Sequence, residues 1–234
     1  MIGAIIGDIV GSRFEWDNHR SKDFELFTPK CFVTDDSIMT LAVGKALMCS
    51  KPDWSDLPEQ AVRCMQEVGR PYPDCGYGGH FLGWMYADDP QPYHSFGNGA
   101  AMRVSACGLV AKSVEEAKAL SRAVTIVTHD HTEGLKGAEA TAVAIYMGKG
   151  GAPMADIRAC MEGYYALDFT LDSIRATYRF NETCQQTVPQ ALEAFFESTG
   201  FEDAIRNAIS IGGDSDTLAA ITGGVAEAYY GVPE

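Results

Sequence analysis

Two short acidic motifs lie far apart in the chain, and both could supply oxygen ligands to a metal ion. The first, TDDS, covers 34–37, and the second, GGDSDT, covers 212–217. Each combines two carboxylates with hydroxyl groups, which are the hard oxygen donors that Mg²⁺ and Mn²⁺ prefer. One such motif cannot complete a coordination sphere. We therefore expect the two motifs to meet in the fold and to hold metal together.

The same acids also have a purely structural explanation as helix caps. Both motifs run into an apolar helical pattern, and acids at a helix N-terminus cap the helix and offset its dipole. Taken alone, capping is the stronger explanation for the first motif, with Thr34 as the N-cap. The pair of motifs is more specific, because five carboxylates would then gather and two divalent ions would neutralise four charges. Without ions, such a cluster would raise its own pKa values. The five acids are Glu15, Asp35, Asp36, Asp214 and Asp216.

Residues 70–99 are the least regular part of the sequence and are rich in glycine, proline and aromatic residues. A long irregular stretch inside a domain is usually functional. The segment GNG at 97–99 can adopt positive φ and turn backbone N–H groups toward an anion. The alternative is a simple turn before a helix that begins at Ala100. The pattern alone leaves both interpretations open.

The segment HDH at 129–131 offers a second set of metal-binding side chains. A His-Asp doublet in a helical protein is similar to the HD-type phosphohydrolases, which also need an upstream histidine and a distant aspartate. His80 and His94 could serve, but neither lies in a helical pattern. We therefore favour a polar cap on the following helix, or a substrate contact. No GxSxG segment and no cysteine–histidine signature supports nucleophilic catalysis.

Composition restricts the class of protein. The chain has 234 residues, 46% of them hydrophobic, and a net charge of −14, which argues against a nucleic-acid footprint. Seven cysteines without a CxxC pair indicate reduced thiols in a cytoplasmic protein. The N-terminus has no basic region before its apolar run, and no run approaches the ~20 residues of a membrane span. We expect a cytoplasmic monomer with no membrane partner.

The hydrophobic periodicity predicts helices throughout, and no run alternates convincingly as a strand. In the first segment, glycines at 3, 7 and 11 share one helical face, where a second backbone could approach closely, and a buried strand is the alternative for this short apolar run. The glycine pair 223–224 in the last helix also calls for close packing. We predict an all-α fold with one domain over 1–234. The expected helices are 1–12, 34–48, 56–69, one from 100, 114–127, 134–148, 153–166, 171–178, 188–199, 202–210 and 215–230.

Four motifs in order along the chain resemble those of the ADP-ribosylglycohydrolases related to dinitrogenase reductase-activating glycohydrolase. The ordered set is specific and covers almost the whole chain, whereas any one motif alone would be a weak signal. The motifs are Gly7-Asp8 through Glu15, TDDS at 34–37, GNGAAMR at 97–103 and GGDSDT at 212–217, with Thr128-His129, Thr183 and 188–192 as further matches.

The resemblance implies two divalent cations, Mg²⁺ or Mn²⁺, in a dinuclear metal cleft. The implied metal ligands are Thr34, Asp35, Asp36, Asp214, Asp216 and Thr217. The implied substrate-binding residues are Ser95, Phe96, Gly97, Asn98 and Gly99 for the phosphates and His129 for the ribose. The expected catalytic carboxylates are Glu15, Asp36 and Asp74, and we expect Glu15, or Asp74 as the alternative, to handle the proton.

The activity implied by the resemblance is hydrolysis of the N- or O-glycosidic bond between ADP-ribose and an acceptor. The acceptor would be a modified protein side chain or another ADP-ribosylated group, and the sequence does not distinguish arginine from serine linkages. A catalytically silent ADP-ribose-binding protein of the same fold and an HD-type metal-dependent phosphohydrolase are the alternatives. The presence of every implied metal ligand favours the enzyme.

Overall fold

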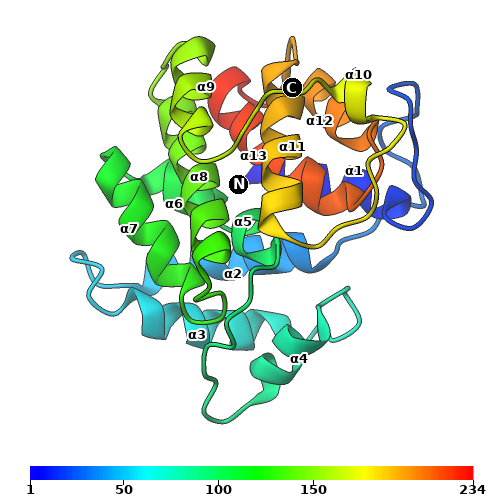
Figure 1. The fold of residues 1–234 in the computed structure, drawn as a ribbon. Coiled ribbons are helices and arrows are strands. Elements are labelled where there is room, and N and C mark those ends of the chain that lie inside the picture. The colour runs from blue at the N-terminus through cyan, green and yellow to red at the C-terminus, as the bar shows by residue number, and fades with distance from the viewer. Residues whose placement is uncertain (234) are drawn as a thin grey trace.

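The computed structural model describes residues 1–233, and helices account for all of the regular structure in that range (Figure 1). The helices are α1 Ile2–Gly11, α2 Asp35–Cys49, α3 Leu57–Gly69, α4 Gly79–Tyr86, α5 Gly99–Met102, α6 Ser105–Val110, α7 Val114–Thr125, α8 Thr132–Lys149, α9 Met154–Glu162, α10 Leu171–Ile174, α11 Cys184–Phe196, α12 Phe201–Ile209 and α13 Ser215–Tyr230. A 3-10 turn, Ser12–Phe14, follows α1. The strand-like pairing in the described residues is an isolated bridge between Gly97 and Thr183. The all-α prediction is confirmed.

α1 and α13 pack against each other along a face of glycines, as their spacing predicted. A Cβ on Gly3 would lie 2.3 Å from the carbonyl oxygen of Gly223, and a Cβ on Gly7 would lie 2.0 Å from that of Ala219. Gly11 makes the same close approach to Ser215, at 2.5 Å. The two helices therefore run antiparallel in backbone contact, and any larger side chain on this face would push them apart. The start of α1 thus lies beside the end of α13.

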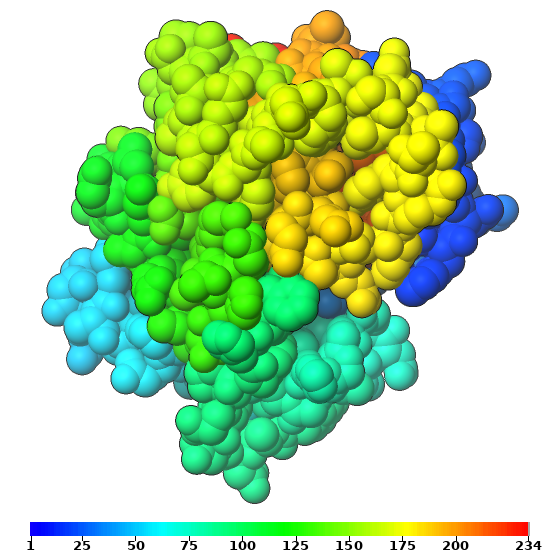
Figure 2. All heavy atoms as spheres, in the orientation of Figure 1, coloured from blue at the N-terminus to red at the C-terminus, as the bar shows by residue number. Residues whose placement is uncertain are grey.

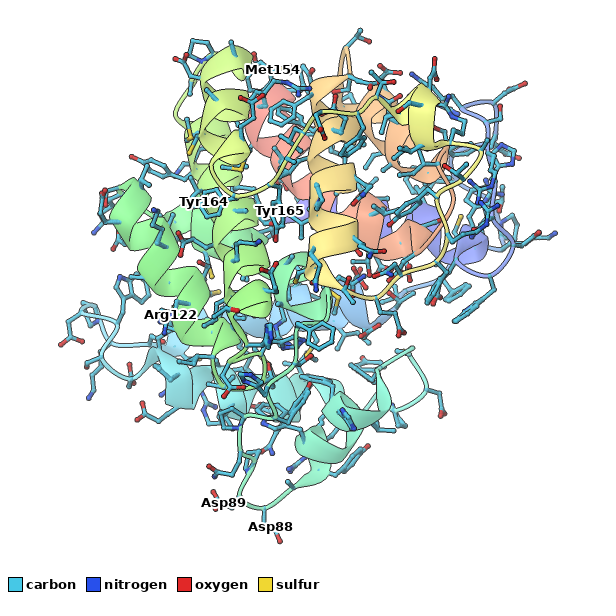
Figure 3. All side chains as sticks on the ribbon, in the orientation of Figure 1. Asp88, Asp89, Arg122, Met154, Tyr164 and Tyr165 are labelled. Carbon is cyan, nitrogen blue, oxygen red and sulfur yellow. The ribbon has the colours of Figure 1, made fainter. Side chains whose placement is uncertain are left out.

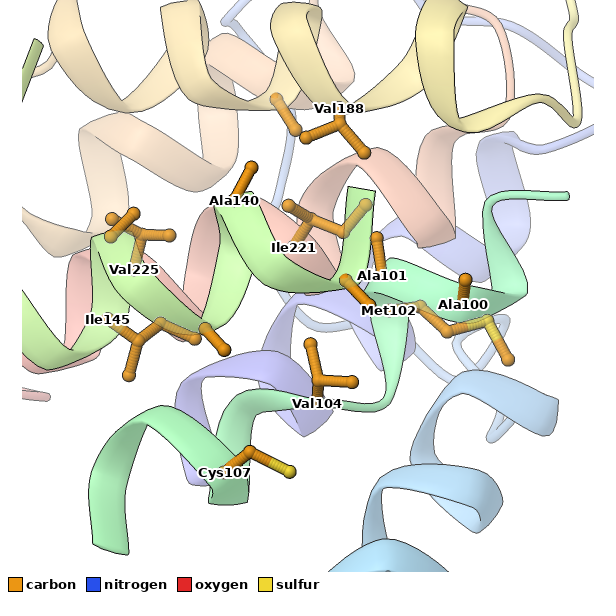
Figure 4. Packing of buried hydrophobic residues seen from close by; sticks show 14 of the residues in the cluster. Ala100, Ala101, Met102, Val104, Cys107, Ala140, Ile145, Val188, Ile221 and Val225 are labelled. Atoms are coloured by element: carbon orange, nitrogen blue, oxygen red, sulfur yellow. The ribbon is translucent and has the colours of Figure 1, made fainter. Parts of the chain in front are cut away.

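α13 is the central helix of the core. Its residues from Ser215 to Ala226 are all buried, and after the acidic motif at its start this stretch consists almost entirely of small and apolar residues. α8 and α11 pack on it, and Figure 4 shows Ile145 of α8 and Val188 of α11 among the side chains gathered around Ile221 and Val225 of α13. α2 and α3 form a further layer below this core in Figure 1. The last helix is therefore fixed from several sides.

The structure departs from the predicted elements where turns compete with the hydrophobic pattern. α4 forms inside the stretch that was expected to be irregular, and the helix expected from Ala100 is split into α5 and α6. α11 begins at Cys184, which places Pro189 inside the helix rather than near its start. α10 ends at Ile174, four residues earlier than expected. Apolar spacing alone cannot locate such short turns.

Two smaller expectations concern cysteines and membranes. All seven cysteines are free thiols, and three of them, Cys64, Cys107 and Cys184, are buried as small core residues. Among residues 1–233, no helix has both the length and the apolar composition needed to cross a lipid bilayer.

Candidate active site

A cleft of about 310 Å³ brings together segments that are distant in the sequence. Figure 2 shows the surface hollowed between the yellow segment around 175–186 and the blue-green segment around 76–99. The cleft contains most of the predicted site residues, and it adds several that the sequence did not single out. The predicted residues on its wall are Glu15, Asp35, Asp36, Ser95, Gly97, Asn98, Gly99, His129, Asp214, Asp216 and Thr217.

The first acidic motif is held at the N-terminus of α2 by a buried carboxylate, Asp8 of α1. Asp8 accepts hydrogen bonds from the Thr34 hydroxyl at 2.6 Å, the Thr34 backbone N–H at 3.1 Å and the Ser37 N–H at 3.0 Å. The Thr34 hydroxyl also accepts from the Asp36 N–H at 3.3 Å, as an N-cap does. The capping explanation is therefore correct for Thr34. It leaves the carboxylates of Asp35 and Asp36 facing the cleft.

The second motif begins with two glycines in the left-handed region, where φ is 69° at Gly212 and 83° at Gly213. This hinge lets the chain turn sharply from Ile211 into α13 and places Asp214 and Asp216 at the base of the cleft. A Cβ on Gly213 would lie 2.4 Å from the ring of Tyr178, so space as well as conformation requires glycine there.

The two motifs meet, as predicted. The Thr217 hydroxyl donates to Asp36 Oδ2 at 3.2 Å, which joins the beginning of α13 to the beginning of α2. Carboxylate oxygens of Glu15, Asp214 and Asp216 lie within 4.8 Å of one another. Five acids therefore converge from three segments of the chain, with both helix N-termini directed at the same place.

The donor set fits divalent cations. Asp36 Oδ1 is buried and has no hydrogen-bond partner, although a buried acceptor normally finds one. The one cationic side chain on the cleft wall is Arg103, whose guanidinium is bonded to Thr128. Several carboxylates without a counter-charge and an unsatisfied buried oxygen are what a hard-cation site presents before its ion binds.

The charges of the cluster perturb its pKa values. Burial, followed by the charge of Asp216, raises the pKa of Glu15 to about 7. Burial raises the pKa of Asp214 to about 6, and burial together with neighbouring carboxylates raises those of Asp36 and Asp216 well above their usual range. Without a nearby cation, Glu15 is partly protonated near neutral pH.

Three predicted site residues do not lie on the cleft wall. Thr34 is buried beneath it with its hydroxyl on Asp8, and Asp74 is exposed on the segment between α3 and α4. Phe96 is 44% exposed and packs against the ring of His131 instead. The structure therefore favours Glu15 over Asp74 as the carboxylate near any reacting bond.

The glycine segment before α5 has a different conformation from the one expected. Neither Gly97 nor Gly99 has positive φ, and Asn98 is αR with φ −66°. The N–H of Gly97 is bonded to Ser95 Oγ and that of Asn98 to the Glu182 carbonyl, so neither is directed at the cleft. The N–H groups of Gly97 and Asn98 are therefore used within the fold, as in the alternative of a turn before a helix, and phosphate binding by this segment stays a prediction.

The same segment contributes to the site through the Asn98 side chain and through the room that its two glycines leave beside His129. The Asn98 side chain donates to Asp214 Oδ2 at 2.7 Å and to Thr187 Oγ1 at 3.2 Å, which ties the segment to the second acidic motif. Cβ atoms on Gly97 and Gly99 would come within 3.5 Å and 3.6 Å of His129 Nε2. The glycines therefore keep the edge of the imidazole open to the cleft.

His129 is 4% exposed and is held by Arg103. The Arg103 Nη2 donates to the Thr128 hydroxyl at 2.6 Å and lies 3.3 Å from His129 Nδ1. Burial, with the nearby guanidinium charge, holds the pKa of His129 well below its usual range. With a cation beside Nδ1, the neutral ring carries its proton on Nε2, and His129 can donate a hydrogen bond into the cleft.

The HDH segment does not form a metal site. His131 caps α8 by accepting from the Glu133 N–H at 3.0 Å, as the capping interpretation predicted. Asp130 accepts from the backbone N–H of His94 at 2.6 Å, and His129 faces the cleft separately. The three side chains do not converge, so the HD-type alternative loses its basis.

Several cleft residues were not identified from the sequence. Arg103 belongs to one of the four motifs but had no assigned role. Asp8, which supports the first acidic motif without lining the cleft, had none either. Phe180 and Glu182 come from the irregular segment before α11, where no pattern pointed to a site. Asp88 and Asp89, by contrast, lie at the outer tip of the loop after α4 and take no part (Figure 3).

Comparisons with known proteins agree with the motifs. A family model described as ADP-ribosylglycohydrolase matches residues 1–234. ADP-ribosylhydrolase ARH3 of Homo sapiens is 24% identical to this chain, and the match covers 100% of this chain and 85% of that protein. ARH3 of Mus musculus is 23% identical, and the match covers 100% of this chain and 83% of that protein. A solved structure described as an ADP-ribosylglycohydrolase-related protein complex superposes with a TM-score of 0.74 and 24% identity, covering 98% of this chain and 85% of that chain.

Proposed function

Because the chain belongs to the ADP-ribosylglycohydrolase family, we propose that it hydrolyses the glycosidic bond between ADP-ribose and an acceptor group. Water adds to the anomeric carbon of the ribose, the bond from that carbon to the acceptor nitrogen or oxygen breaks, and the acceptor leaves with a proton. ADP-ribose and the unmodified acceptor are the products. The observation that carries the proposal is the convergence of five acids and His129 on one cleft.

We propose that the acids hold two divalent cations, Mg²⁺ or Mn²⁺. The residues that would hold them are Asp35, Asp36, Asp214, Asp216 and Thr217, with Glu15 as an exchangeable ligand. Thr34 stays in the proposed set, because a hydroxyl can donate to Asp8 and still offer a lone pair to a cation. When bound, such ions would polarise substrate hydroxyls and lower the pKa of a water molecule.

The other side chains of the cleft would exchange the proton, bind the substrate and position the acids. Glu15, with a pKa of about 7 before any cation binds, is suited to exchange a proton with water or with the leaving group. His129 can donate from Nε2 to a ribose oxygen, and the Ser95 hydroxyl lies where a phosphate could accept from it. Asn98 holds Asp214 in place at 2.7 Å and so couples the substrate side of the cleft to the acids.

The test is turnover of defined ADP-ribosylated substrates. Arginine-, serine- and DNA-linked ADP-ribose would each be incubated with the protein in Mg²⁺ and in chelator, and release of ADP-ribose would be measured. We expect release in Mg²⁺, loss in chelator, and a large loss for Glu15→Gln. Asp88→Asn, an acid-to-amide change at the exposed loop tip, is the matched control and should be unchanged. Calorimetric binding of ADP-ribose without any turnover would instead identify a silent binding protein.

A further inference from the structure

A short stretch of paired backbone fixes the segment before α5 against the start of α11. The Asn98 N–H donates to the Glu182 carbonyl at 2.7 Å. The Cys184 N–H donates to the Phe96 carbonyl at 3.0 Å, and its thiol donates to the Gly97 carbonyl at 3.1 Å. These bonds hold the main chain of Asn98 in one register against α11, so its side chain always meets the same residues of that helix.

The side chain that Asn98 meets is Thr187, in the first turn of α11. Thr187 is 0% exposed, and its hydroxyl donates its proton to the Asn181 carbonyl at 3.0 Å. With that proton in use, the hydroxyl oxygen accepts from Asn98 Nδ2 at 3.2 Å. The same nitrogen also donates to Asp214 Oδ2 at 2.7 Å. Three hydrogen bonds in series therefore connect the main chain before α11 to the second acidic motif.

The Asn98 amide needs a second acceptor because its nitrogen carries two hydrogens and Asp214 accepts only one of them. Thr187 accepts the other and so holds the plane of the amide in the orientation that donates to Asp214. Asn98 is 6% exposed and Asp214 is 5% exposed, so little water is at hand to replace a lost partner. Buried polar groups left without a partner destabilise the arrangement that contains them.

We propose that Thr187 is a positioning residue for the acidic centre: it orients Asn98, and Asn98 orients the Asp214 carboxylate for a cation. The inference rests on the proposed function and deepens it, since Thr187 itself does not line the cleft. A group that bonds to a metal-binding carboxylate fixes the direction of its free lone pairs, and its loss typically costs about 10- to 100-fold in metal affinity. Thr187 acts one bond further away, so its removal should cost less.

The first experiment measures Mg²⁺ affinity by calorimetry without substrate. Thr187→Val keeps the shape of the side chain but lacks the hydroxyl, and it should weaken Mg²⁺ binding about fivefold, whereas Asn98→Ala should weaken it about tenfold. Thr187→Ser restores the hydroxyl and should restore the affinity. Unchanged affinity in Thr187→Val, or no recovery in Thr187→Ser, overturns the proposal.

Thr222→Val is the matched control for a purely structural effect. Thr222 of α13 is also 0% exposed, and its hydroxyl donates to the Ala191 carbonyl of α11 at 2.9 Å. It therefore loses the same kind of bond to the same helix without touching Asn98. We expect both valine variants to lose stability in urea, and only Thr187→Val to lose Mg²⁺ affinity. Equal losses of affinity in the two variants would make the role of Thr187 structural and overturn the proposal.

A double-mutant cycle tests whether Thr187 acts through Asn98. In an Asn98→Ala background, Thr187→Val should cost almost no further Mg²⁺ affinity, because the residue on which it acts is already gone. A second loss of about fivefold in that background would mean that the two effects are independent, and the proposed series of bonds would be wrong.

Hydrolysis of ADP-ribosyl linkages separates this inference from the proposed function. The expected pattern of Mg²⁺ affinities, together with a wild type that hydrolyses no linkage, would reject the proposed activity and keep the role of Thr187. Hydrolysis by the wild type, with unchanged kcat/KM and unchanged Mg²⁺ affinity in Thr187→Val, would reject the role and keep the activity. A wild type that binds no divalent cation would reject the role together with the proposed cation site.

Discussion

The two acidic motifs meet at the same place, but they are held there in different ways. The first lies on a regular helix N-terminus and is fixed by Asp8, a carboxylate from the preceding helix, through three hydrogen bonds. The second follows Gly212 and Gly213, both with positive φ. It is supported by hydrogen bonds from Asn18, which lies 195 residues away from Gly213. One half is supported by its neighbours in sequence and the other by a distant loop.

Asn18 is the main support of the second half. Its amide donates to the carbonyls of Phe14, Glu15 and Gly213, each at 2.9 Å, and its oxygen accepts from the Gly213 N–H at 2.9 Å. Arg20, from the same loop, donates to the Ile211 carbonyl at 2.7 Å. The loop after α1 therefore attaches the Glu15 turn to the glycine hinge. We expect the second half to be the more easily disturbed, and four experiments test that difference.

The largest effect should follow from removing an acid of the second half. We expect Asp216→Ala to abolish metal binding at the shared site and to lower kcat/KM by about 10³-fold, the size of losing a preorganised electrostatic contact. Helical content should be nearly intact, because the substitution also removes a source of repulsion. Metal stoichiometry by mass spectrometry checks this, with Asp88→Ala as the control. Unchanged metal occupancy would contradict a site made of both halves.

A rise in pH should lower the stability of the metal-free protein, and bound Mg²⁺ should raise it. The pKa of Glu15 is raised from 4.5 to about 7 and that of Asp214 from 3.8 to about 6, so the metal-free folded state binds more protons than the unfolded chain in this range. Its stability should therefore fall as pH rises from about 4 to 7. Mg²⁺ at 100 times its Kd should restore about 3 kcal/mol.

Melting temperatures measured across this pH range in chelator and in Mg²⁺ check both signs. Glu15→Gln should flatten the dependence in chelator, because the amide does not titrate. A melting temperature that ignores Mg²⁺ at pH 7.5 would mean that the acids are not a cation site.

The distant support of the second half can be removed at Asn18. Asn18→Ala loses four hydrogen bonds, and we expect a loss of about 2 kcal/mol of stability, since water replaces part of each bond. Metal affinity should fall as well, because the hinge that places Asp214 is released. Urea denaturation and metal titration measure the two effects. Asn18→Asp keeps only the acceptor for the Gly213 N–H, so its stability and metal affinity should lie between those of Asn18→Ala and the wild type. Wild-type metal affinity in both variants would show that the glycine hinge does not depend on Asn18.

The smallest effect should come from the cap of the first half. Thr34→Ala removes one helix cap and should cost about 1 kcal/mol, while Asp8 still accepts from the backbone of Thr34 and Ser37. Thr34→Ser should recover most of it. Urea denaturation in chelator measures the cap together with the hydrogen bond from the Thr34 hydroxyl to Asp8, and repeating it in Mg²⁺ shows whether the hydroxyl also binds metal. If Thr34→Ala lost more stability in chelator than Asn18→Ala, the first motif rather than the second would be the more easily disturbed.

The same difference explains what could be predicted from the sequence. The acids, the glycine face of α1 and the cap at Thr34 follow from residue type and local spacing, and the structure confirms all three. The role of Asn18 at the hinge is invisible in the sequence, because Gly213 lies 195 residues away from it. Phe180 and Glu182 were missed for the same reason: their segment has no periodicity, and only tertiary packing brings it to the cleft.

The sequence left two conformations open for 97–99, and the structure has the turn before a helix rather than the positive-φ loop. A Gly-Asn-Gly sequence permits positive φ, but it does not require it. Here Asn98 gains hydrogen bonds to Asp214 and Thr187 by starting a short helix, and that tertiary gain exceeds the local preference. A Cβ on Gly97 or Gly99 would meet His129 Nε2 at 3.5 Å or 3.6 Å, which is ordinary van der Waals contact, so the space beside His129 does not by itself require either glycine.

The backbone contact between α1 and α13 has a consequence for synthesis on the ribosome. α1 is made well before α13, so its glycine face stays uncovered until the ribosome has made α13. The contact is therefore among the longest-range in the protein, and contacts of that kind form slowly. Because α13 also carries the second acidic motif, a nascent chain cannot assemble the acidic centre ahead of its core. Completion of the fold and onset of cation binding should consequently occur as one late event.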